Sequence, residues 1–122
     1  MARISSIQPR KQRKFRYTAP LHVKGAFLHA PLAADLREKY GKRSFRVVTG
    51  DTVKVLRGEF AGTEAVVDKV DVKNSKVLVH GVSLKKANGE EVPRALDPSK
   101  VMITKLNTKD AIRMARLEVK KA

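Results

Sequence analysis

The spacing of apolar residues changes near residue 50. From Thr52 onward they alternate with polar ones, and this period of two predicts β-strands. In AVVDKVDV the alternation assigns Val66, Val70 and Val72 to one face. Short strands joined by tight turns favour a mostly β chain that closes into a small, strongly bent antiparallel barrel over residues 47–106. The expected strands are TVKVL (52–56), AVVDKVDV (65–72), KVLVH (76–80), the arms of a hairpin near residue 88, and VMITKL (101–106).

The dipeptide Asn88-Gly89 marks that hairpin, because both residues tolerate the positive φ angles of a two-residue turn. Such a turn pairs Lys86 with Glu91 and Lys85 with Val92. In this register Glu91 partly neutralises Lys86. Lys85 is then the better contact for an anion.

A short helix is expected before the barrel, in PLAADLREKYG. Pro31 suits the first helical turn, and Gly41 is placed to end the helix. Leu32, Leu36 and Tyr40 form an apolar stripe that we interpret as a packing face. Residues 31–46 therefore read as a short helix followed by a basic connector.

The tail at 107–122 is also expected to be helical. Asn107 can cap it, and Lys120 and Lys121 lie near its end, where cations are favoured. Its apolar stripe is poor, so the helix should be stable only when it is docked on this protein or on a partner. The stripe consists of Ile112, Ala115 and Val119.

Residues 1–30 show neither period and contain no acidic residue; the first carboxylate is Asp35. Like charges repel, and few apolar groups offset the entropy of ordering, so we expect an extended, mobile basic arm. Against RNA the arm would become ordered as its cations displace counterions. Phe15 and Tyr17 lie among these cations, where they either stack on unpaired bases or pin the arm to the body.

Charge adds the strongest indication of a partner. Lys and Arg total 27 against 12 Asp and Glu, a net charge of +15. Such an excess indicates nucleic acid, although it can also serve solubility alone. Residues 50–71 are nearly balanced, so the excess lies in the arm and flanks. The expected RNA contacts are Arg3, Arg10, Lys11, Arg13, Lys14, Phe15, Arg16, Tyr17, Lys24, Lys42, Arg43, Arg46, Arg57, Lys85 and Lys100.

Several classes of site and partner are disfavoured. The chain has no cysteine, and His22, His29 and His80 lack the spacing of metal ligands. We therefore expect no metal and no cofactor. No apolar run approaches the roughly 20 residues of a membrane helix, and no secretory signal is evident. The expectation is a cytosolic protein with no membrane partner, no small-molecule substrate and no homo-oligomer.

Glycines 50, 58 and 62 could either cradle a phosphate or shape the backbone. A P-loop requires G-x-x-x-x-G-K-[ST] before a helix. Here Gly58 to Gly62 is one residue too short, and Thr63 and a strand follow. We therefore expect Gly58 and Gly62 to turn the chain between the first two strands. Phe60, at the tip of this loop, either folds under the barrel, which we favour, or is exposed as a contact.

The segment GDTVKVLRGEFAG, followed by VVDKV, resembles the KOW motif, a strand–glycine loop–strand unit of ribosomal proteins and transcription elongation factors. Ala65 departs from it, because many KOW motifs have glycine there. The flanks HAPLAADLREKYGKRSFRV, KANGEEV and DPSKVMITKL resemble the archaeal and eukaryotic large ribosomal subunit protein twenty-four family. This resemblance runs from about Lys11 to Lys109. The positions that match the KOW motif are Gly50, Asp51, Val53, Val55, Gly58, Gly62 and Val67.

The resemblance implies an SH3-like barrel that binds ribosomal RNA directly, early in large-subunit assembly and near the polypeptide exit tunnel, beside other large-subunit proteins. A KOW-type elongation factor module is the alternative, but it would normally carry an upstream domain that contacts the polymerase. An enzyme acting on RNA would need paired histidines or clustered carboxylates. His22 and His29 have no carboxylate nearby in sequence. We expect no enzymatic activity.

Overall fold

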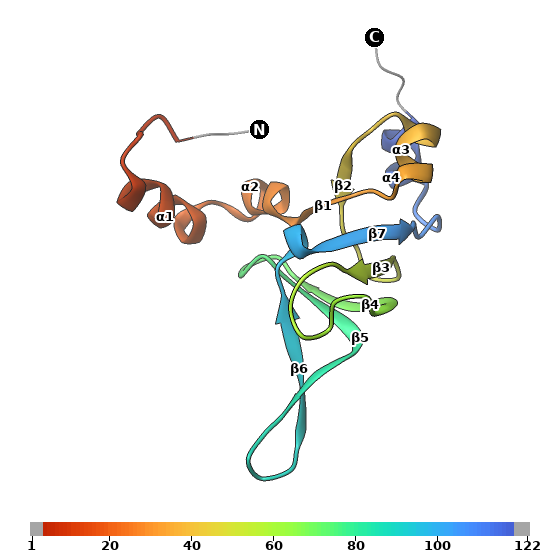
Figure 1. Ribbon diagram of the computed structural model, residues 1–122. Helices are drawn as coiled ribbons and strands as arrows, with labels where there is room; N and C mark the ends of the chain where they lie inside the picture. Colours follow the sequence, from red (N-terminus) through yellow and green to blue (C-terminus); the bar gives the residue numbers. More distant parts are fainter. Residues whose placement is uncertain (1–3, 119–122) are drawn as a thin grey trace.

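The protein is seen here in a computed structural model that describes residues 4–118 (Figure 1). A two-stranded sheet pairs β1 with β2, and a bent five-stranded antiparallel sheet has the order β6-β5-β4-β3-β7. This arrangement confirms the mostly β, barrel-like fold with a helix on either side. The helices are α1 (Pro9–Thr18), α2 (Leu21–Lys24), η1 (Gly25–Leu28), α3 (Ala34–Tyr40), η2 (Pro98–Lys100) and α4 (Ala111–Glu118). The strands are β1 (His29–Pro31), β2 (Ser44–Arg46), β3 (Thr52–Val55), β4 (Glu64–Asp71), β5 (Lys76–Lys85), β6 (Glu91–Leu96) and β7 (Val101–Lys105).

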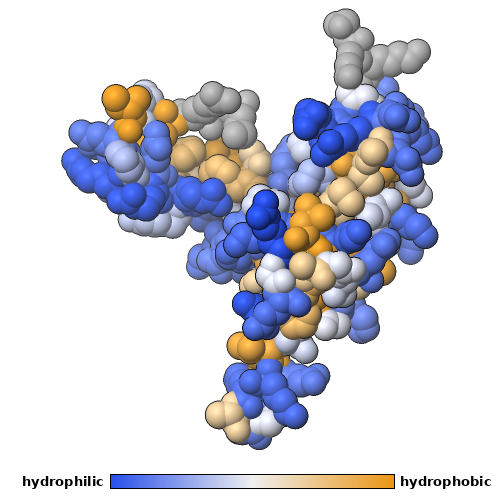
Figure 2. Space-filling model, viewed as in Figure 1, coloured by the Kyte–Doolittle hydropathy of each residue, from blue (hydrophilic) through white to orange (hydrophobic). Residues whose placement is uncertain are grey.

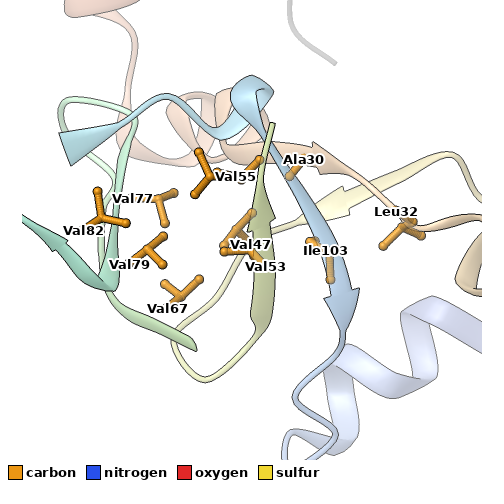
Figure 3. Packing of buried hydrophobic residues seen from close by; sticks show 11 residues of the cluster. Ala30, Leu32, Val47, Val53, Val55, Val67, Val77, Val79, Val82 and Ile103 are labelled. Carbon is orange, nitrogen blue, oxygen red and sulfur yellow. The ribbon is translucent and has the colours of Figure 1, made fainter. Parts of the chain in front are cut away.

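Branched side chains from four strands meet inside the bent sheet (Figure 3). In β3 the expected alternation holds, because Val53 and Val55 are fully buried. Ala30 and Leu32, which lie before residue 47, and Val47 at the start of the barrel join them. The segment before the barrel thus contributes to the core instead of only leading up to it. The remaining fully or nearly fully buried members are Val67, Val77, Val79, Val82, Val101 and Ile103.

The face assigned to β4 was wrong. Val67 is buried, whereas Val66 is 45% exposed. The β4–β5 register shifts between Val67 and Lys69. A bulge adds one residue to a strand, so the side chains beyond it change face. Val70 therefore still packs against the core, although it is an odd number of residues from Val67.

The hairpin register was also wrong by one residue. Lys85 pairs with Glu91 and Leu84 with Val92, and the Lys86 amide donates to the carbonyl oxygen of Glu90 (2.8 Å). The loop thus has three residues and ends at Gly89, whose φ is +93°. Three-residue hairpin loops commonly place glycine in this left-handed position. Lys85, and not Lys86, lies opposite Glu91, so the reason for preferring Lys85 as an anion contact is removed.

Gly58 and Gly62 shape the backbone, as expected. Their φ angles are +94° and +91°, and no atom lies within 4 Å of the position of an added Cβ. Backbone conformation, and not lack of space, therefore requires glycine here. The Gly62 amide donates to the carbonyl oxygen of Val55 (2.7 Å), which closes the loop. Phe60 packs against the core, which confirms the folded-under interpretation.

The helix before the barrel begins at Ala34, three residues later than predicted. Pro31 instead ends β1, and Leu32 forms a bridge to Ile103 of β7. The amides of Leu32 and Ala33 donate to the carbonyl oxygens of Arg43 and Ile103 (both 2.9 Å), so the backbone here forms sheet-like pairs in place of a helical turn. Gly41 ends the helix with φ +66°, as predicted.

The last helix also starts late and buries a different face. Asp110 caps it, accepting a hydrogen bond from the Ile112 amide (3.0 Å), in place of Asn107. Arg113 and Leu117 are buried, whereas Ile112 is 69% exposed. The predicted stripe was therefore wrong, because a buried charged residue supplies the contact. Val119, Lys120 and Lys121 lie outside the described residues.

The basic arm is not extended, and this expectation was wrong. Residues 9–18 form α1, with Pro9 in its first turn. Its Lys, Arg and Gln residues are good helix formers, and proline is favoured at that position. The Phe15 ring packs edge-on against Phe27 of η1, with centroids 6.2 Å apart. Charge repulsion is thus overcome by helix propensity and one aromatic anchor.

Candidate nucleic-acid interface

The cations of α1 are exposed and lack acidic neighbours on their own helix. The helix has no acidic residue in its first turn and no buried residue. Figure 2 shows mostly hydrophilic residues on the visible face of this arm. A helix that keeps its cations in water presents them at fixed positions to an incoming polyanion. The exposed cations are Arg10, Lys11, Arg13, Lys14 and Arg16; Arg3 lies outside the described residues.

The two aromatic residues of the arm lie in different environments. Phe15 is partly buried against Phe27, and the Arg16 guanidinium lies 4.7 Å from the centroid of the same ring. Phe15 therefore pins α1 to the body. Tyr17 is 69% exposed, so its ring is accessible for stacking on a base, and that role stays a prediction.

Lys24 does not fit the role predicted for it. Only 6% of the residue is exposed, and its Nζ donates to the carbonyl oxygen of Tyr17 (3.1 Å). The ammonium thus binds a carbonyl near the C-terminal end of α1, where a cation is favoured. We correct Lys24 from an RNA contact to a group that fixes the helix.

The connector cations are divided in the same way. Lys42 Nζ donates to the carbonyl oxygen of Arg116 (2.6 Å) and lies 5.5 Å from the centroid of Phe45, so it links the connector to α4. Arg43 and Arg46 are exposed. The connector thus offers two accessible cations.

Partial burial, and then the charge of Arg46, lower the pKa of His29 below its usual value.

At one end of the barrel, four cations line a single hollow. Arg57 and Lys100 were expected to contact RNA, whereas Lys76 and Arg94 were missed. Lys85 does not line this hollow; it lies on the β5–β6 hairpin that projects from the barrel (Figure 1). Lys76 was missed because it begins a strand, and Arg94 because alternation alone does not show which end of the sheet it joins. Sheet topology brings them together.

Asp97 lies among these cations. Its partial burial raises its pKa, but hydrogen bonds from the Ser99 amide (3.0 Å) and hydroxyl (2.9 Å), and then the charges of Lys76 and Arg16, outweigh that effect. The net result is a pKa below the usual value. Asp97 is therefore ionised at neutral pH.

Asp51 of the KOW motif is a structural residue. It is fully buried. Its Oδ1 accepts a hydrogen bond from Nη1 of Arg113 (2.8 Å), and its Oδ2 accepts one from Nη2 (2.6 Å). Its oxygens also accept from the amides of Val48 (3.1 Å) and Asn107 (2.8 Å). Arg113 was not among the residues predicted from the sequence. An arginine four residues before Leu117, on a helix with a poor apolar stripe, was the available signal.

Known proteins match this chain over nearly its whole length. A model of the ribosomal protein family that comprises the eukaryotic L26 proteins and their archaeal L24 counterparts matches residues 6–120. The chain belongs to this family. It is 84% identical over 120 residues to large ribosomal subunit protein uL24 of Methanocorpusculum labreanum, covering 98% of this chain and 99% of that protein.

More distant members of the family also align along almost their whole length. The uL24 protein of Methanoculleus marisnigri is 62% identical over 96% of this chain and 97% of its own. That of Haloarcula marismortui is 53% identical over 93% and 94%. The α1 arm, the barrel and α4 therefore all lie inside the region shared by the family.

Proposed function

We propose that this chain is a structural constituent of the large ribosomal subunit that binds ribosomal RNA directly. Family membership supports the ribosomal role. The observation that supports RNA as the partner is the row of exposed cations on α1, which has no acidic residue and a fixed helical geometry. A surface of this kind binds phosphates in preference to neutral ligands.

The mode of binding follows from the two kinds of cation. Those of α1 are exposed to water, as are Arg57 and Lys100 at the barrel end, and they can replace counterions on RNA. Those that hold the fold together, Lys24, Lys42 and Arg113, are occupied by protein acceptors. Selectivity would then come from RNA shape and A-form geometry more than from base edges. The chain acts as a rigid platform and we expect no catalytic step.

Its place in the subunit is the second part of the proposal. The family resemblance implies binding early in large-subunit assembly, near the polypeptide exit tunnel and beside other large-subunit proteins. The protein would accordingly be found on ribosomes in the cytoplasm.

Among residues 4–118, no helix is long and apolar enough to cross a membrane, and no group of three or more His, Asp or Glu side chains could hold a metal ion.

Direct binding to protein-free ribosomal RNA tests the proposal. The full chain should bind large-subunit RNA more tightly than small-subunit RNA in the same buffer. In sucrose gradients of cell lysate it should sediment with the large subunit after a high-salt wash. Equal affinity for both RNAs would contradict direct recognition, and sedimentation with RNA polymerase would instead favour the elongation-factor alternative.

A further inference from the structure

One basic hollow lies at the end of the barrel, outside the arm that dominates the charge. Its cations come from separate parts of the sheet: Arg57 follows β3, Lys76 begins β5, Arg94 lies in β6 and Lys100 ends η2. Glu59 and Asp97 are its acidic members. Four cations against two acidic residues give the hollow a net positive charge that favours anions. One of the cations, Lys100, belongs to η2, which lies against η1.

The arm reaches this hollow through a short chain of contacts. Arg16 of α1 lies over the ring of Phe27 in η1, with its guanidinium carbon 4.7 Å from the centroid. η1 in turn lies against η2, whose first turn is capped by Asp97. The guanidinium of Arg16 thus lies on an aromatic ring of η1, the element that packs against η2.

Arg94 shows that the hollow presents a guanidinium to an exposed anion. Its Nη1 donates to Oε2 of Glu59 (3.0 Å), and its guanidinium carbon lies 6.0 Å from the centroid of Phe60. The Glu59 side chain is 75% exposed, so water can solvate it when another anion takes its place. Exposed ion pairs of this kind contribute little stability. A phosphate can therefore displace this carboxylate at small cost.

We propose that this hollow and Arg16 form one clamp for a single strand of the RNA sugar–phosphate backbone. The inference rests on the proposed RNA-binding function and adds where one strand runs: between α1 and the barrel end, across η2. Lys76 and Arg94 become phosphate contacts, and Glu59 becomes an internal competitor for Arg94. Asp97 keeps its place by accepting from the Ser99 hydroxyl.

Charge-neutral substitutions with matched controls test the clamp by RNA-binding assays on the full chain. Lys76→Gln and Lys100→Gln should each weaken binding to large-subunit RNA by about tenfold, the scale of one hydrogen bond to a charged group. Lys86→Gln removes the same charge from the exposed hairpin loop and should change affinity much less. Equal losses in Lys76→Gln, Lys100→Gln and Lys86→Gln would overturn the clamp while leaving direct RNA binding intact.

Glu59→Gln gives a test with the opposite sign. Removing the competitor should tighten binding by about two- to fivefold, the scale of an exposed ion pair. Glu90→Gln makes the same change of net charge on the hairpin and serves as the control. If both variants tighten binding equally, the gain comes from net charge alone and the clamp is refuted.

Phosphate-ethylation interference then tests whether one strand is shared. Ethylating the phosphates in the clamp should block binding by the unmodified protein. Arg16→Gln and Lys76→Gln should each relieve that interference within one continuous stretch of one strand. Relief on separate strands would contradict the clamp. If the unmodified protein shows no preference for large-subunit RNA at all, the proposed function fails first and the clamp fails with it.

Discussion

Helices α1 and α4 are both rich in arginine, yet they use it in opposite ways. In α1 the cations are exposed, and no acidic residue lies in the helix. In α4 Arg113 is only 7% exposed, and its terminal nitrogens are held by Asp51. The residue type therefore does not decide between binding and folding. Burial and the presence of a partner carboxylate do.

The largest expected effect comes from breaking the α4 contact. Asp51→Ala should lower the free energy of unfolding by about 3–5 kcal/mol, because it leaves a buried guanidinium without its counterion. It also leaves the Val48 and Asn107 amides without an acceptor. Arg113→Ala should cost slightly less, since Asp51 keeps those two donors. Urea denaturation measures both.

The control for this pair is Arg116→Ala, on the exposed surface of the same helix. It should change the free energy of unfolding by no more than about 0.5 kcal/mol. A loss as large as that of Arg113→Ala would mean that α4 is stabilised by its general charge and not by the buried pair.

Removing the cations of α1 should weaken RNA binding while leaving the free energy of unfolding nearly unchanged, the reverse of what is expected for the Asp51–Arg113 pair. Replacing Arg10, Lys11, Arg13 and Lys14 with Gln keeps helix propensity but removes four of the proposed phosphate contacts. The slope of log affinity against log salt should fall by about 3, from roughly 0.7–0.9 per phosphate. Stability should hardly change. An unchanged slope in salt titrations would show that α1 is not a main phosphate contact.

The anchor of α1 can be weakened without touching its charge. Phe27→Ala removes the ring that carries both Phe15 and Arg16. Such aromatic and cation–π contacts contribute about 1–2 kcal/mol together. Hydrogen exchange of α1 amides should become faster while amides of β3 and β4 keep their protection. Equal acceleration everywhere would mean that Phe27 supports the whole fold.

Changes in the glycine loop should lower stability by less than loss of the Asp51–Arg113 pair but by more than loss of the α1 cations. Gly62→Ala should destabilise the barrel by about 1–2 kcal/mol, since a left-handed conformation is costly once a Cβ is present. Gly62→Asn should cost less, because asparagine tolerates positive φ. Thermal unfolding can rank the two variants. Equal losses would point to lack of space, although no atom lies near the added Cβ.

A small pH effect is expected from His29. Its pKa is lowered in the folded protein, so unfolding takes up a proton below pH 6.5, the usual histidine pKa. Stability should therefore fall slightly as the pH drops through that value, and His29→Gln should reduce the fall. His22→Gln, at an exposed position, is the control. An unchanged pH profile in His29→Gln would contradict this assignment.

The parts of the fold that depend on short-range rules were predictable. Alternation found β3 and β7, the loop glycines had the backbone role expected, and Gly41 ended its helix. Two errors came from single inserted residues: the bulge after Val67 and the third residue of the hairpin loop. A strand period cannot reveal such an insertion, because the extra residue becomes visible only in the register with the neighbouring strand.

The candidate site was predictable in its charge but not in its geometry. The arm's cations could be read from the sequence. Its helix formers and Pro9 were local signals for a helix, but charge repulsion was given more weight than they were, and the Phe27 anchor lies outside the segment that it stabilises. Lys24 was assigned to RNA because nothing in its neighbourhood indicates that its ammonium is buried. Lys76 and Arg94 were overlooked, because only the sheet order brings them beside Arg57 and Lys100.

The Asp51–Arg113 pair also determines when, during translation, the barrel can fold completely. During synthesis Asp51 emerges 62 residues before its counterion. Until α4 is available, closing the barrel would bury a carboxylate without its guanidinium. A nascent chain that has reached Leu106 has all seven strands but lacks this partner. The fold is therefore complete only after α4 has been translated, and not when the last strand has been translated. Stable closure of the barrel thus depends on a helix that follows it in the sequence.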